Sequence, residues 1–438
     1  MRFEAAGDSF PEPNLILAVL VGAKIPRKIK RLPLVSAQAL IFLRKKQTSN
    51  EKEATVGKSR KDASLFQFID REMFNKLAIR HQIDKGVRSL STWEMTGALI
   101  EALTLRLGSL REAEGTLGVA RSTLSNAMAS RPSGFFQDLC DQVLFGIRKR
   151  TRCRKVKRAI RELLAIDSTE IDVHGSLFGR PSWAKKRGDG SAASLKLHVV
   201  WNVDQEWVED FSISGARKHD SPAATRLRLQ PDKMYVFDRA YNDLGWWLSI
   251  IQAESHFVTR LKDCAKNTAL RKKVLAKARG GDGVLHDGLY EPSYVLRLRH
   301  RESLEVVRIR HIVYRDPETK KIFDFVTSDL KAPAQDIANI YRRRWAVELL
   351  FRWLKGHLDL RRLTVKNANA AEVQSAAAVL VLLLLQLKRI LEKYGGTLWE
   401  LLRSIRTRLN LRGLSGSASR EGCRWSSPPM ANLAKVRS

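Results

Sequence analysis

The sequence has few cysteines, and their spacing argues against a zinc site or a disulfide framework. Four of the 438 residues are cysteines, and no two of them form a Cys-x-x-Cys pair: Cys140, Cys153, Cys264 and Cys423. Structural zinc sites and small disulfide-rich secreted domains both need closely spaced cysteines. The pattern therefore fits a protein of a reducing cytoplasm.

Long apolar segments are also missing. The run Leu15–Val21 is short, and the acidic residues Glu4 and Asp8 before it do not make the basic start of a signal peptide. The run Ala376–Leu385 has ten apolar residues, whereas a helix needs about 20 to span a bilayer. We therefore expect no membrane span, and we expect the second run to be a buried helix.

The chain has far fewer acidic residues than basic ones. Lys and Arg number 78 against 46 Asp and Glu, so the formal net charge is +32 and the isoelectric point is near 10.3. Such a balance indicates a polyanionic partner, with nucleic acid ahead of an anionic membrane. Hydrophobic residues make up 44% of the chain, which is enough for two or three folded domains.

Hydrophobic periodicity is weak at both ends and clear in between. Residues 1–63 end in a polar, Lys-rich segment, and residues 412–438 are rich in Ser, Gly and Arg. We expect both ends to be disordered extensions, because such compositions bury little apolar surface.

Residues 64–146 have the pattern of an all-α N-terminal domain. Apolar residues recur three and four positions apart, and Ser91 is a good N-cap for a helix that begins at Thr92. Around Gly118, the segment 109–132 predicts two short helices joined by a tight turn. In a DNA-binding helix-turn-helix, the second helix would bring three side chains to a groove: Arg121, Thr123 and Asn126. An ordinary helical hairpin explains the same pattern equally well.

A basic segment, residues 147–162, follows the helices. Nine of its first fifteen residues are Lys or Arg. A charge run is often only a solvated segment. Because this one joins a helical domain to a strand in a very basic protein, we expect a linker that contacts phosphates.

Two aspartates stand in apolar segments with the alternation of a strand. In LLAIDSTEIDV, Asp167 shares the mostly apolar face with Leu163 and Ala165, and in PDKMYVFD, Asp238 ends a short apolar run. A carboxylate on an apolar face indicates a specific role, because burying an unpaired charge is energetically unfavourable. An Asp after an apolar run is often only a helix cap, but two together are more informative. We expect both at the ends of buried strands.

Further strands are predicted on either side of Asp238. In SLKLHVVWNV, Lys196 and His198 share a polar face, which we expect to be solvated, with a place over the site of the two aspartates as the alternative. Residues 254–332 form a β-rich segment, in which Pro317–Thr319 predicts a hairpin turn. Its alternating basic residues form either a DNA-facing sheet or a basic solvent face: Arg297, Arg299, Arg308 and Arg310.

One helix-like segment, Tyr341–Lys355, gathers reactive side chains. At about 100° per residue, four of them fall in a stripe about 60° wide: Tyr341, Arg344, Glu348 and Lys355. Arg352 joins this stripe, and the opposite face is apolar. Glu348 can bind a divalent cation while Arg344 and Lys355 hold phosphate oxygens. A solvated charged face on an amphipathic helix is the alternative.

The spacing Tyr-x2-Arg-x3-Glu-x6-Lys resembles the signature helix of insertion-sequence transposases of the IS-four type. In that family the Glu is the third acid of a catalytic Asp-Asp-Glu set, and the contexts AIDST and FDRAY around Asp167 and Asp238 are similar to those of the other two acids. The resemblance covers about residues 64–411. It includes FNKLAIRH, STWEMTGAL and SLREAE, which look similar to the N-terminal domain of one branch of these transposases.

The resemblance implies a fold and a site. The fold is α/β, with a ribonuclease-H-like catalytic core formed by residues 163–253 and 333–411, a β-rich insertion at 254–332, and an all-α N-terminal DNA-binding domain before it. In the family, the three acids hold two Mg2+ ions about 3.5–4 Å apart, for which we expect Mn2+ to substitute. These acids are Asp167, Asp238 and Glu348.

The resemblance also implies an activity and partners. The expected reaction is cleavage and strand transfer at the ends of a bacterial insertion sequence, as in cut-and-paste transposition. The partners are double-stranded DNA, both the inverted-repeat ends and the target, and a second copy of the chain, in the bacterial cytoplasm. The contacts to the cleaved end are Tyr341, Arg344, Arg352 and Lys355.

Two other functions remain open. A nuclease or resolvase of the same fold would cut without joining, and a DNA-binding protein or decayed transposase would bind ends without cutting. The three acids favour an enzyme. The insertion and the N-terminal helices favour a protein that recognises two ends of one element.

Overall fold

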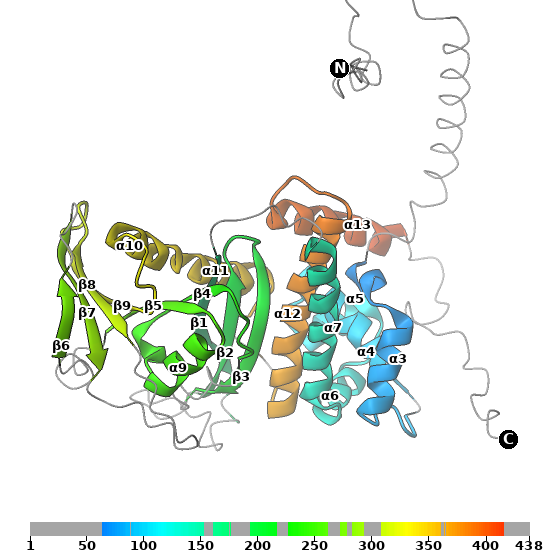
Figure 1. The fold of residues 1–438 in the computed structure, drawn as a ribbon. Helices are drawn as coiled ribbons and strands as arrows, with labels where there is room; N and C mark the ends of the chain where they lie inside the picture. Colours follow the sequence, from blue (N-terminus) through cyan, green and yellow to red (C-terminus); the bar gives the residue numbers. More distant parts are fainter. Residues whose placement is uncertain are drawn as a thin grey trace, which may run out of the picture. The chain divides into compact units, whose positions relative to one another are not determined.

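The described residues form a layer of helices and one long sheet (Figure 1). The structure is a computed structural model, and everything it describes belongs to the unit Ala63–Ser438. It describes residues 64–87, 89–152, 161–174, 176, 193–216, 227–261, 272–277, 283–292, 308–360, 363 and 365–415. The extension predicted at 1–63, most of the predicted tail and residues 153–160 of the basic segment lie outside these ranges.

The helices before the sheet begin where the sequence offers caps. They are η1 (Leu65–Phe68), α3 (Arg71–Arg80), α4 (Thr92–Leu105), α5 (Leu110–Leu117), α6 (Arg121–Ser130) and α7 (Ser133–Arg152). Ser91 accepts a bond from the N–H of Glu94, whose side chain bonds back to the N–H of Ser91, so α4 starts with a capping box. The N-cap predicted at Ser91 is confirmed.

The predicted turn between two short helices is present. Gly118 has the left-handed φ of 73° that closes the C-terminus of α5, and α6 follows directly after the turn. On α6, Arg121 and Asn126 are exposed and Thr123 is half-buried. The two short helices and the tight turn between them are therefore confirmed, while a helix-turn-helix that reads DNA stays a prediction.

One mixed sheet carries all described strands, in the order β3-β2-β1-β4-β5-β9-β8-β7-β6. Their bounds are β1 (Glu162–Val173), β2 (Ala193–Asn202), β3 (Trp207–Gly215), β4 (Lys233–Phe237), β5 (His256–Arg260), β6 (Lys272–Lys277), β7 (Val284–Pro292), β8 (Ile309–Arg315) and β9 (Ile322–Thr327). The β1–β2 and β2–β3 pairs are antiparallel, and the β1–β4 and β4–β5 pairs are parallel. The α/β class and the single large sheet agree with the predicted fold class.

The strands of residues 254–332 extend this sheet. β5 continues the parallel part beside β4, and β9 pairs antiparallel with β5. Between β8 and β9, the carboxylate of Asp316 accepts bonds from the N–H groups of Glu318 and Thr319. The hairpin turn predicted at Pro317–Thr319 is confirmed.

Strand β1 is buried on both faces. Leu163 and Ala165 belong to the larger core, which also contains the helices, whereas Leu164 and Ile166 belong to a second core on the other face. Asp167 continues the first set, because side chains alternate along a strand. The face predicted for Asp167 is confirmed.

The strand end predicted at Asp167 was wrong. β1 continues to Val173 because β2 pairs with it as far as Ala193. β4 instead stops at Phe237, immediately before Asp238. The end of β4 therefore defines the place of both aspartates, and Asp167 lies in the middle of its strand.

The remaining helices pack on both faces of the sheet and on the helical layer. They are η3 (Arg239–Tyr241), α9 (Leu244–Gln252), α10 (Ala334–Arg343), α11 (Trp345–His357), α12 (Ala368–Leu391) and α13 (Leu398–Ser415). α9 packs in the second core, and α11 buries its predicted apolar face in the larger core through Val347, Leu350 and Leu354.

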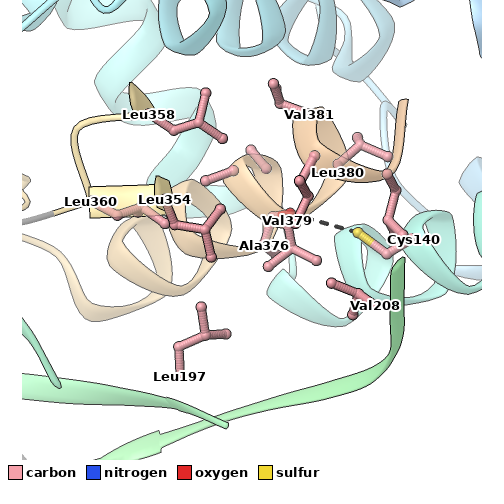
Figure 2. Packing of buried hydrophobic residues seen from close by; sticks show 14 of the residues in the cluster. Cys140, Leu197, Val208, Leu354, Leu358, Leu360, Ala376, Val379, Leu380 and Val381 are labelled. Atoms are coloured by element: carbon pink, nitrogen blue, oxygen red, sulfur yellow. Dashed lines mark hydrogen bonds between the residues drawn. The ribbon is translucent and has the colours of Figure 1, made fainter. Parts of the chain in front are cut away.

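Helix α12 joins the helical layer to the sheet. It packs against both α7 and β3. Figure 2 shows Ala376, Val379 and Leu380 of α12 beside Cys140 of α7, and the Cys140 thiol lies 3.6 Å from the carbonyl of Ala376. α12 is long and apolar enough to cross a bilayer, but 89% of its apolar window is buried inside the protein. The buried helix predicted here is confirmed.

Candidate active site

Asp167 and Asp238 lie next to each other where β4 ends. The last register pair of β1 and β4 is Ile166 with Phe237, so each aspartate is the next residue of its own parallel strand segment. The carboxylate of Asp167 accepts a bond of 2.8 Å from the N–H of Ser168. Asp238 precedes η3, but its side chain makes no capping bond there. Its position therefore has no helix-cap explanation.

The segment predicted as one helix, Tyr341–Lys355, is two helices that meet at Arg344. At this junction the N–H groups of Arg344 and Val347 bond to carbonyls three residues earlier, as in a 3-10 turn. The prediction of a continuous helix was wrong because these tighter bonds interrupt the regular ladder. The polar stripe nevertheless stays together and faces the two aspartates.

One guanidinium links two of the three predicted acids. Arg344 places its Nη1 2.5 Å from Oδ2 of Asp167 and its Nη2 2.6 Å from Oε1 of Glu348, and its side chain is only 12% exposed. The hydroxyl of Tyr341 lies 3.5 Å from Oδ1 of Asp238. β1, the end of β4 and the two helices thus bring all three predicted acids to one junction.

The surroundings at this junction shift the pKa of Asp167. Burial raises the pKa of Asp167 to about 6, although the Arg344 guanidinium acts against this shift, and the carboxylates of Asp238 and Glu348 add to it. Burial acts to lower the pKa of Arg344, but its anionic neighbours, Asp167 first, outweigh burial and raise it. The three carboxylates supply oxygen atoms that a cation could use as ligands.

A cleft of about 460 Å³ opens beside Asp167 and Glu348. Its lining combines acids, hydroxyls, one ring and two cations: Asp167, Ser168, Thr169, Glu348, Phe351, Arg352 and Lys355. The two cations lie on α11, where Arg352 is exposed and Lys355 is half-buried. Such a lining suits an anionic ligand bound together with a cation.

The predicted acids fit magnesium by their chemistry, since Mg2+ and Mn2+ prefer oxygen ligands such as carboxylates. Among the described residues, however, no group of three or more His, Cys, Asp or Glu is gathered closely enough to hold a metal ion. Arg344 stands between Asp167 and Glu348 instead. An ion held by Asp167 and Glu348 would therefore compete with this guanidinium.

The predicted DNA-reading residues of the N-terminal helices lie outside this cleft. Arg121, Thr123 and Asn126 lie on α6 and are not among the residues of the lining. Asn369 of α12 fixes the end of α6, because its side-chain amide donates to three carbonyls there: those of Met128, Ala129 and Arg131.

The solvated face predicted for His198 was wrong. His198 is fully buried, and its ring bonds to the hydroxyls of Tyr241 at 3.0 Å and Ser214 at 2.8 Å. β2 is buried on both faces, and its almost continuous apolar pattern is typical of such a strand. The apolar pattern of the sequence was the signal for this burial. Lys196, on the same face, is only half-buried.

The exposed position predicted for Arg310 in the β-rich segment was wrong. Arg310 is 11% exposed and pairs with Asp287 at 2.7 Å, and it donates to the carbonyl of Ala332. It therefore does not belong to a DNA-facing surface. Arg308 is exposed, and Arg297 and Arg299 lie outside the described residues.

Comparisons with known proteins show which families the sequence matches. The family described as "Transposase DDE domain" matches residues 158–384, and a family described as a domain of unknown function (DUF4372) matches residues 63–127. A protein of Sinorhizobium fredii named as transposase y4zB is 31% identical over 63% of this chain and 74% of its own length.

Two further relatives bear names of the same kind. A protein of Geobacillus stearothermophilus, named as a transposase for insertion sequence element IS5377, is 27% identical over 60% of this chain and 66% of its own length. One of Synechocystis, named for element IS4SA, is 25% identical over 64% of this chain and 75% of its own length.

Among solved structures, the piggyBac transposase synaptic complex with hairpin DNA aligns with a TM-score of 0.44 at 10% identity, over 81% of this chain and 82% of that chain. A likeness this low does not decide the fold. The family match, which spans more than half of the chain, and the relative at 31% identity do decide the family. The chain belongs to the transposases with a DDE domain.

Proposed function

We propose that this transposase cleaves DNA at the ends of an insertion sequence and joins the freed ends to target DNA. Asp167, Asp238 and Glu348 are its catalytic acids. The observation that carries the proposal is the junction at Arg344, which ties a carboxylate of β1 to one of α11 beside the end of β4. The names of two relatives, which refer to insertion sequence elements, support the substrate.

The strand order supports a ribonuclease-H-like core. β3, β2 and β1 pair antiparallel, and β1, β4 and β5 pair parallel in that order. This is the arrangement in which two neighbouring central strands each carry one acid. The spacing of Tyr341, Arg344 and Glu348, with Lys355 on the next turns, supports the IS-four type.

The three acids would hold two Mg2+ ions, with Mn2+ as a substitute. When bound, such ions lower the pKa of an attacking water or 3′-hydroxyl and stabilise the leaving oxygen of an in-line displacement. The chain's own task is to place the phosphodiester. Lys355 and Arg352, which line the cleft, bind its oxygens, and Arg344 joins them when it leaves the carboxylates. Tyr341 keeps its hydroxyl beside Asp238.

Recognition of DNA ends uses a different part of the chain. α6 presents Arg121, Thr123 and Asn126 to the inverted-repeat end, and the basic segment 147–162 contacts phosphates. Two copies of the chain hold two ends of one element, in the bacterial cytoplasm and on the nucleoid when bound.

The test compares the wild type with Glu348→Gln, which removes one charge and keeps the shape of the side chain. Each is incubated with labelled DNA that carries the element boundary and with a second DNA, once with Mg2+ and once with EDTA. We expect the wild type with Mg2+ to nick at the boundary and to join the 3′ ends to the second DNA. Glu348→Gln should bind equally and do neither.

The other outcomes decide against the proposal in different ways. Cutting without joining would indicate a nuclease or resolvase. Binding with no metal-dependent chemistry in either protein would indicate a DNA-binding protein that has lost catalysis.

A further inference from the structure

A buried hydrogen bond connects β2 with the short helix η3, close to the two aspartates. The hydroxyl of Tyr241 lies 3.0 Å from Nδ1 of His198, and both residues are fully buried. The other ring nitrogen of His198 bonds to Ser214 of β3 at 2.8 Å. The imidazole is thus held between the sheet and the short helix η3, and neither residue is part of the cleft lining.

Each partner in this bond lies close in the backbone to one of the aspartates. His198 is the register partner of Ser168, the residue directly after Asp167. The N–H of Tyr241 donates to the carbonyl of Asp238 at 3.0 Å. One side-chain contact therefore links the backbone around Asp167 with the backbone around Asp238.

The β1–β4 ladder does not fix the backbone of Asp238, because the ladder ends one residue earlier, at Phe237. Asp238 has an extended backbone and makes no side-chain capping bond to η3. Beyond the last ladder pair, η3 is otherwise held by the packing of Tyr241 in the second core and by two bonds of Asn242 to β5, one to the carbonyl of Arg260 and one from the hydroxyl of Thr259.

We infer that the His198–Tyr241 bond is a strut that sets the separation of Asp167 and Asp238. His198 and Tyr241 are then positioning residues for metal binding, although neither contacts the ion or the DNA. The inference rests on the proposed function, since it takes the two aspartates as metal ligands. Partners behind the ligands of a metal commonly change its affinity by about 10–100-fold.

The test measures Mn2+ binding to the full chain without DNA, from the electron paramagnetic resonance signal of free Mn2+. Tyr241→Phe removes the strut and keeps the ring. We expect it to bind Mn2+ about tenfold more weakly than the wild type.

The matched control is Tyr235→Phe. Tyr235 of β4 is also buried, but its hydroxyl accepts a bond of 2.7 Å from the N–H of Gln230, which precedes β4 at the end opposite to Asp238. Tyr235→Phe loses the bonds of its hydroxyl to the backbone of Gln230, and Tyr241→Phe loses the bond to His198, so both melting temperatures should fall. Only Tyr241→Phe should lose Mn2+ affinity.

A rescue at the other end of the strut separates positioning from general packing. His198→Leu should weaken Mn2+ binding as Tyr241→Phe does. His198→Asn keeps a polar group near the position of Nδ1 and should recover part of the affinity.

Asp238→Asn tells the two possible failures apart. If Asp238→Asn weakens Mn2+ binding while Tyr241→Phe and Tyr235→Phe both match the wild type, the strut is refuted and the proposed metal site stands. If Asp238→Asn binds Mn2+ as tightly as the wild type, the metal site itself is refuted, and the strut with it.

Discussion

Arg344 cannot bind the carboxylates of Asp167 and Glu348 and a DNA phosphate at the same time. Its guanidinium bonds to the carboxylates of Asp167 and Glu348. In the proposed reaction it is needed at the phosphate of the bound DNA. Because one side chain cannot fill both places, binding of the ion and release of Arg344 are expected to occur together.

Arg344→Gln tests this competition at the scale of one residue. Removing the guanidinium should tighten Mn2+ binding to the free protein by about tenfold, because the ion no longer displaces a cation from buried carboxylates. Cleavage of the DNA end should nevertheless fall. Both are read from a Mn2+ titration and from a cleavage assay at saturating Mn2+.

Arg352→Gln is the control for net charge, since Arg352 is exposed in the same cleft. It should change Mn2+ affinity much less than Arg344→Gln does. Weaker Mn2+ binding by Arg344→Gln would contradict the competition and would mean that Arg344 mainly holds the acids in place.

At the scale of elements, the turn between α5 and α6 depends on one backbone conformation. Gly118 has a φ of 73°, and a Cβ built on it would meet no atom within 4 Å. Any loss of stability caused by a side chain at this position would therefore come from the backbone conformation and not from a steric clash. Gly115, inside α5, likewise has free space around a Cβ but carries no positive φ.

The two glycines predict opposite effects of the same substitution. Gly118→Ala should lower the free energy of unfolding by about 1 kcal/mol, because L residues are strained in the left-handed region. Gly115→Ala should raise it by about 0.5–1 kcal/mol, because alanine favours a helix interior. Urea titrations followed by circular dichroism measure both. Equal signs for the two variants would contradict the role assigned to the turn.

At the scale of the whole molecule, a buried carboxylate ties the helical layer to the sheet. Glu209 of β3 pairs with Arg148 of α7 at 2.6 Å and accepts bonds from Trp207, Asn202 and Gln230. Burial acts to raise the pKa of Glu209, but Arg148 and these donors outweigh it and lower the pKa.

Glu209→Gln should therefore destabilise the protein in a pH-dependent way. A lowered folded pKa contributes stability above the ordinary glutamate value of 4.5, and this stability is lost as pH falls through the folded pKa. We expect a loss of about 2–3 kcal/mol at pH 7, which shrinks at acidic pH. Denaturant unfolding at several pH values measures it, and a loss that does not vary with pH would refute the ionised pair.

The sequence determined the features that depend on neighbours along the chain. The cap at Ser91, the turn at Gly118 and the hairpin at Pro317–Thr319 follow from local backbone bonding. The face of Asp167 follows from alternation along a strand, and the burial of α12 follows from its apolar composition. The three acids and the cations near them were recognisable through their spacing and their contexts.

Only the tertiary structure decided which distant groups meet. The length of β1 depends on its pairing with β2, so the strand passes Asp167 without ending there. The burial of His198 and Arg310 depends on elements that cover them from elsewhere in the chain. The same holds for Arg344, whose two carboxylates come from β1 and α11. Local propensity carries no record of such contacts, because they form between residues far apart in the chain that only packing brings together.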